Sequence, residues 1–93
     1  MKAINFKFGT ELTFKSVISE RAKLQQVMIT DGSDRLCLDL SNVSHCDSAG
    51  LALLIEARKL CKQHNKTFEV IGISGETRSL AEFCGVECVL EQL

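Results

Sequence analysis

The chain has 93 residues, with 11 Lys and Arg against 12 Asp and Glu, so its formal net charge is -1 at pH 7. This length predicts one domain over residues 1–93, and 45% hydrophobic residues are typical of a globular protein. A near-neutral charge argues against nucleic-acid binding, and no apolar run is long enough for a membrane span or a signal peptide. Such a small core leaves little room for an enclosed substrate pocket. We therefore expect a cytoplasmic domain that is not an enzyme and does not insert into a membrane.

The first part of the chain predicts two strands and a helix. Residues 4–8 alternate apolar and polar side chains, as half-buried strands do. A Gly-Thr pair separates them from a second short run at 12–14, so the two runs predict an antiparallel hairpin. Ser19 is a favourable N-cap for a helix that continues to about residue 29.

The rest of the chain alternates strands and helices. Residues 36–40 are almost all apolar, which favours an inner strand covered on both faces. The alternation predicts an α/β fold with about three main helices and a mostly parallel, mixed sheet of four to five strands. The remaining predicted elements are a long helix over 50–64, a strand over 67–73, a helix over 74–84 capped by Gly85, and a short strand over 88–90.

The long helix carries more apolar surface than one core-facing stripe requires. On a helical wheel, Leu51 and Ile55 fall beside the core face, in the direction of solvent. Exposed apolar residues with charged neighbours often mark a surface that binds a partner. The alternative is that both side chains widen the core face beneath a neighbouring helix.

Asp47 and Ser48 stand immediately before the long helix. Both residue types are preferred N-caps, because their side chains satisfy free backbone N–H groups. The same position exposes the Ser48 hydroxyl, and a phosphate there would meet those N–H groups and the positive end of the helix dipole. Phosphorylation of Ser48 would then change the surface beside Leu51 and Ile55 without unfolding the domain.

The five Cys and two His residues predict neither a metal site nor a catalytic centre. No CxxC pair exists, and the spacing of His45, Cys46, Cys84 and Cys88 matches no zinc pattern. His45 precedes Ser48 by three residues, but no oxyanion arrangement or Gly-rich loop accompanies the pair. We expect no metal, no cofactor and no catalytic residue.

Residues 38–54, which read LDLSNVSHCDSAGLALL, resemble the signature of STAS domains, the fold of bacterial anti-sigma-factor antagonists. In that family a strand ending in Asp-Leu leads to Asp-Ser-x-Gly-Leu or Asp-Thr-x-Gly-Leu at the start of a helix. The predicted order of strands and helices is also similar to that of the family over the whole chain. The resemblance implies a STAS-type domain.

Within the family the Leu-Ala-Leu-Leu continuation is most similar to MlaB-like members, small subunits of the Mla phospholipid-transport ABC complex of Gram-negative bacteria. This resemblance implies binding to an MlaF-like ATPase subunit, in a complex with a permease that maintains outer-membrane lipid asymmetry. Such a subunit is non-catalytic, cytoplasmic, and peripheral to the inner membrane through its partners. The partner-binding residues carried over from the family are Asp47, Ser48, Ala49, Leu51, Ala52 and Ile55.

The Asp-Ser-x-Gly motif by itself also fits an anti-sigma-factor antagonist that is phosphorylated on Ser48 and binds an anti-sigma factor kinase. One departure from the family concerns the segment before the first helix. Many members carry Gly-Glu-Leu-Asp there, and the positions expected to correspond are Ser16-Val17-Ile18-Ser19. The Gly and Glu would then be absent, which puts a partner contact at this segment in doubt.

Overall fold

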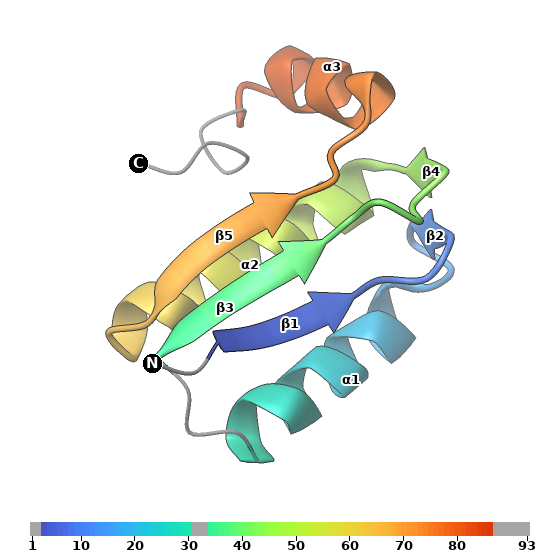
Figure 1. Ribbon diagram of the computed structural model, residues 1–93. Coiled ribbons are helices and arrows are strands. Elements are labelled where there is room, and N and C mark those ends of the chain that lie inside the picture. Colours follow the sequence, from blue (N-terminus) through green and yellow to red (C-terminus); the bar gives the residue numbers. More distant parts are fainter. Residues whose placement is uncertain (1–2, 31–33, 87–93) are drawn as a thin grey trace.

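Figure 1 shows a computed structural model of the chain, which describes residues 3–30 and 34–86. It confirms the predicted α/β fold with three helices and a mostly parallel sheet. The strand predicted over 88–90 lies outside the described residues. In chain order the elements are β1 (Ala3–Lys7), β2 (Glu11–Leu12), α1 (Val17–Thr30), β3 (Arg35–Asp39), β4 (His45–Cys46), α2 (Ser48–Gln63), β5 (Thr67–Ile71) and α3 (Gly75–Phe83).

The described strands form two separate parallel sheets, so the predicted antiparallel hairpin is wrong. The larger sheet has the order β1-β3-β5, and its register places Phe6, Leu38 and Val70 side by side. After β1 the chain leaves this sheet, and β2 pairs with β4 instead. The Thr10 carbonyl accepts a hydrogen bond from the Ser44 backbone N–H at 2.8 Å, which holds the chain beside the approach to β4. Helix α1 then provides the crossover that a parallel β1–β3 pair requires.

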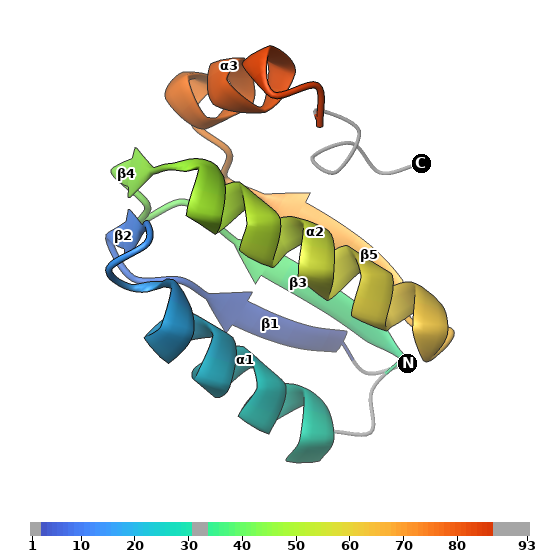
Figure 2. The same cartoon turned by 180° about the vertical axis from the view of Figure 1, so that it is seen from behind.

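Helices α1 and α2 both cover one face of the larger sheet (Figure 2). The core lies between this face and the two helices. The prediction that residues 36–40 are covered on both faces is wrong for the described residues: Leu36 and Leu38 are buried, whereas Cys37 and Asp39 alternate onto the other face and are half-buried. Core residues from the sheet and helices include Ile4, Phe6, Leu24, Leu36, Leu38, Leu54, Ala57, Cys61 and Val70.

The observed helix ends differ from the predicted ends by one to three residues, and Ser19 is not the N-cap of the first helix. Helix α1 begins before Ser19, because the Glu20 N–H already donates to the Ser16 carbonyl at 2.9 Å. Gly85 has a φ of 73°, the left-handed conformation expected of it as a cap after α3. No helix in the described part of the chain has the length and apolarity that a membrane span needs.

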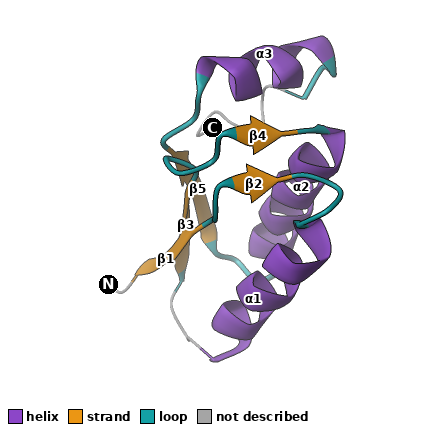
Figure 3. Ribbon diagram, turned by 90° about the vertical axis from the view of Figure 1, so that its right-hand side faces the viewer, coloured by secondary structure: helices purple, strands orange, loops and turns teal. Residues whose placement is uncertain are grey.

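Seen from the side, β2 and β4 lie beyond the ends of the longer strands, next to the start of α2 (Figure 3). The Asp47 N–H donates to the Leu12 carbonyl at 3.3 Å, so the link from β4 to α2 is fixed to β2. The Asp-Ser-x-Gly motif therefore lies where both halves of the chain meet.

Candidate functional site

Asp47 joins the start of α2 to the loop before α1. As the N-cap of α2, it accepts a hydrogen bond from the Gly50 N–H on Oδ1 at 3.1 Å. Its other oxygen, Oδ2, accepts from the N–H of Phe14 at 3.0 Å. One carboxylate thus satisfies two backbone donors that are 36 residues apart in sequence (50 − 14) and fixes the two segments against each other.

The same contacts keep the Asp47 carboxyl ionised. Desolvation alone would raise its pKa, but backbone N–H donors, chiefly those of Phe14 and Gly50, outweigh it, so the pKa is lowered. A lowered pKa in the folded protein means that ionised Asp47 stabilises the fold at pH values above the ordinary carboxyl pKa. This contribution is lost as the pH falls through the lowered value.

Replacing Asp47 by alanine is expected to lower the free energy of unfolding at pH 7 by about 2 kcal/mol, because a cap and a loop hydrogen bond are both lost. The difference from wild type should shrink as the pH is lowered below about 4. Urea denaturation at several pH values measures both effects. Asp34→Ala, at an exposed carboxylate before β3, is the control and should change little; a pH-independent loss in Asp47→Ala would contradict this role for the charge.

Gly50 allows α2 to lie directly against β2. A Cβ at this position would be 2.1 Å from the Leu12 carbonyl oxygen and 3.0 Å from Cys46 Sγ. Only a residue without a side chain fits this contact, which explains why the motif has glycine at this position. The close approach in turn allows Asp47 to reach the loop before α1.

The residues predicted to bind a partner separate into exposed and buried groups. Ser48 and Ala52 are exposed, and Ala49 is half-buried beside them. Leu51 is only 2% exposed and belongs to the core, so its interpretation as a solvent-facing residue is wrong. Ile55 is half-buried and packs against the same core. For Leu51, the alternative interpretation of a wider core face is confirmed.

Two large apolar side chains from the other half of the chain stand next to the exposed residues of α2. Phe14 is 68% exposed, and its backbone N–H donates a hydrogen bond to the Asp47 carboxylate. Ile18 is 80% exposed and lines a groove of about 230 Å³ between the first turns of α1 and α2. Ala49 and Ala52 line the same groove. We call Phe14, Ile18, Ser48, Ala49 and Ala52 together the docking face.

The sequence pattern alone gave Phe14 and Ile18 no predicted site role. The strand predicted over 12–14 includes Phe14 and would bury it, but Phe14 lies in the loop after β2. Ile18 could have been found from its position out of phase with the buried side of α1, where Glu20 and Leu24 point inward.

The structure also corrects the expected correspondence to Gly-Glu-Leu-Asp. Ser16 directly precedes α1 and residues 17–19 form its first turn, so these four positions do not link a strand to the helix. Glu11 and Leu12 form β2, and residues 13–16 link it to α1. Thr13 follows β2, and its hydroxyl donates to Glu11 Oε1 at 2.7 Å.

Cys88, one of the four residues considered for a metal group, lies outside the described residues. Among residues 3–30 and 34–86, no three Cys, His, Asp or Glu side chains form a group that could hold a metal ion. Desolvation by burial, followed by the nearby Asp47 charge, raises the pKa of the Cys46 thiol, which disfavours the reactive thiolate. His45 is exposed on β4, and no hydrogen bond joins it to Ser48 in the described structure.

A family model described as "Mlab, STAS domain" matches residues 8–91 of the chain. The anti-sigma-B factor antagonist of Staphylococcus aureus (strain NCTC 8325 / PS 47) is 31% identical over 86 residues, which cover 92% of this chain and 79% of that protein. The anti-sigma-B factor antagonist of Staphylococcus epidermidis is 29% identical over 84 residues, covering 87% and 74%.

Solved structures with low sequence identity share the fold. The anti-sigma factor antagonist SpoIIAA in its unphosphorylated form has a TM-score of 0.78 at 17% identity, covering 97% of this chain and 78% of that one. A sulfate transporter family protein from Wolinella succinogenes has a TM-score of 0.75 at 15% identity, covering 96% and 71%. The family model and the Staphylococcus aureus relative agree with the Asp-Ser-x-Gly turn at the start of α2. The chain belongs to the STAS domain family.

Proposed function

We propose that this protein is a non-catalytic subunit that binds the MlaF-like ATPase of an ABC-type phospholipid transporter. In this role it works in the cytoplasm, peripheral to the inner membrane through its partners, in a complex with a permease that maintains outer-membrane lipid asymmetry. The observation that carries the proposal is the docking face, where apolar side chains remain exposed around a rigidly held helix start. The match to a family model described as "Mlab, STAS domain" supports the choice of partner.

The docking face has the features of a surface that a partner covers. Phe14 and Ile18 are large and apolar, and exposing both costs solvation free energy that burial against a partner would recover. The small Ala49 and Ala52 side chains leave the groove open beside Ile18. The Arg21–Glu56 ion pair, at 2.7 Å between Nη2 and Oε1, brings charged side chains to the groove lining. An apolar centre with charged groups around it is the usual anatomy of a protein interface.

Ile18→Glu is expected to weaken binding to the ATPase encoded in the same genome by at least about tenfold, because a carboxylate would have to be desolvated in the contact. Co-purification of the two proteins, followed by titration, measures the loss. Ile29→Glu is the matched control, since Ile29 is exposed to 81% against 80% for Ile18 but lies in the last turns of α1. Equal binding by both variants and wild type would contradict the docking face.

A second candidate function is that of an anti-sigma-factor antagonist whose binding to an anti-sigma factor kinase is controlled by phosphorylation of Ser48. The exposed Ser48 hydroxyl at the first position of α2 favours it, as do the relatives named anti-sigma-B factor antagonists. Genes for an ABC ATPase and permease beside this one would favour the transporter. Genes for a sigma factor and a kinase would favour the antagonist.

A further inference from the structure

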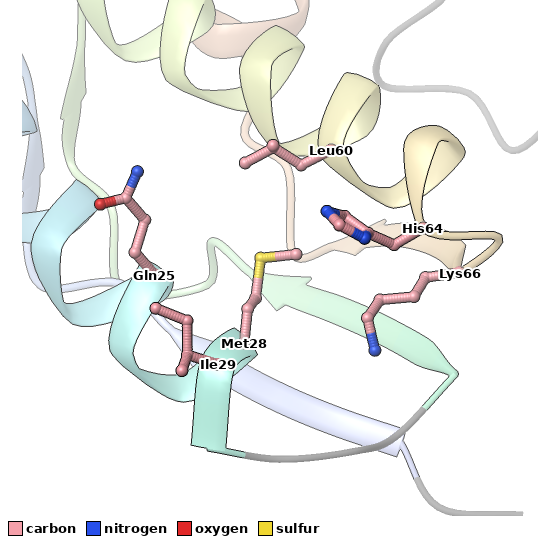
Figure 4. Close-up of a pocket in the computed structure, with 6 residues that line it drawn as sticks. All are labelled: Gln25, Met28, Ile29, Leu60, His64 and Lys66. Carbon is pink, nitrogen blue, oxygen red and sulfur yellow. The ribbon is translucent and has the colours of Figure 1, made fainter.

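A second groove lies between the later turns of α1 and α2, away from the docking face. It has a volume of about 460 Å³, within the range of roughly 300–1,000 Å³ typical of small-molecule sites. None of the predicted partner-binding residues lines it. Figure 4 shows the side chains around it, which are Gln25, Met28, Ile29, Leu60, His64 and Lys66.

The lining combines an apolar middle with polar groups at the two ends. Met28, Ile29 and Leu60 supply the apolar part, with Met28 between the two helices (Figure 4). Met28 and Leu60 are half-buried, whereas Ile29 is 81% exposed. Because Leu60 is only half-buried, part of its side chain is available to the groove.

The two ends of the groove differ in charge. The amide of Gln25 lies at one end, and His64 and Lys66 lie together at the other. The carbonyl end of a helix carries partial negative charge, which here is offset by the cations of Lys62, in the last turn of α2, and Lys66. The ammonium group of Lys66 can pair with an anionic group at this end of the groove.

We propose that this groove binds an amphiphile with a single alkyl or acyl chain and an anionic headgroup. The headgroup lies at Lys66 and His64, and the chain lies along Met28, Leu60 and Ile29. A carboxylate and a phosphate both accept hydrogen bonds from an ammonium group, so either headgroup fits this chemistry. The proposal is independent of the transporter and antagonist functions, because it uses none of the docking-face residues.

The test is titration of the isotope-labelled chain with decanoate, decyl phosphate and the uncharged decyl maltoside, each below its micelle concentration, followed by NMR. At least one anion should shift the signals of Met28, Leu60 and His64, and bind at least about tenfold more tightly than the maltoside. Binding by only one anion would identify the headgroup. Equal affinity for the maltoside, shifts confined to the docking face, or no binding by either anion would overturn the proposal.

Two variants separate a specific site from general detergent binding. Ile29→Glu places a negative charge in the lining at an exposed position that the fold tolerates, and should weaken anion binding at least about tenfold. Its control is Ile18→Glu, which should bind like wild type. Lys66→Met keeps an apolar stem but removes the cation, so it should weaken binding of the anion and leave binding of the maltoside unchanged. Its control is Lys59→Met, at an exposed site on α2 outside the groove, which should change the affinity for neither compound. Unchanged anion binding in both groove variants would contradict the site.

Discussion

Gly50→Ala is expected to lower the free energy of unfolding by about 3 kcal/mol, the upper end of the usual cost of overpacking. The added Cβ would meet the Leu12 carbonyl oxygen at 2.1 Å, and a backbone atom cannot move aside as a flexible side chain can. Helix α2 or strand β2 must then shift, and the shift also strains the bonds of Asp47 to Gly50 and Phe14. Thermal unfolding measures the effect, which for a domain of this size corresponds to a fall in Tm of roughly 12–24 °C.

Gly75→Ala is the matched control for this prediction. Gly75 is also in the first turn of a helix, α3, but nothing lies within 4 Å of a Cβ built there. Alanine should therefore be neutral or raise the stability by up to about 1 kcal/mol, since it restricts the unfolded chain. Since alanine favours a helix more than glycine does, similar losses in the two variants would show that the cost does not come from the Leu12 contact. An unchanged Gly50→Ala protein would contradict the close packing of α2 on β2.

The local patterns predicted most elements, but they could not decide which strands pair. Alternation at residues 4–8 correctly indicated a half-buried strand, and Asp47 and Gly85 correctly marked helix ends. The hairpin was wrong because proximity in sequence favours pairing of neighbours, whereas β1 gains more by burying Ile4 and Phe6 beside β3. Such a gain depends on contacts across the fold, which no short window contains.

The same limit applies to the candidate site. The motif located the start of α2, and the structure confirms Asp47 as its N-cap. The helical wheel could not say whether Leu51 faces solvent, because its burial depends on what packs over that side of α2. Nor could it bring Phe14 and Ile18 to the site, since Phe14 is hydrogen-bonded to Asp47 and Ile18 lines a groove with α2 only in the folded chain. The motif thus predicts the α2 residues of the docking face, whereas Phe14 and Ile18 could be identified only from the tertiary structure.

Ser48→Asp is expected to weaken binding to the partner strongly while leaving the fold intact. Ser48 is exposed at the first position of α2, and a negative charge there is favourable to the helix by about 0.3–1 kcal/mol. The thermal midpoint should therefore be unchanged or slightly raised. Binding should fall by about a hundredfold, because the new carboxylate lies beside Asp47 and must be desolvated among the apolar groups of the docking face.

The results expected for Ser48→Ala and for phosphorylation of Ser48 differ between the two candidate partners. Ser79→Asp, at an exposed serine on α3 that is not part of the docking face, is the control and should bind like wild type. If the partner is the ABC ATPase, Ser48→Ala should retain most binding, and the protein from cells should carry no phosphate on Ser48. If the partner is an anti-sigma factor kinase, that kinase should phosphorylate wild type but not Ser48→Ala, and the phosphorylated protein should behave like Ser48→Asp. Full binding of Ser48→Asp to both partners would contradict a contact at the start of α2, because neither interface could then include this side chain.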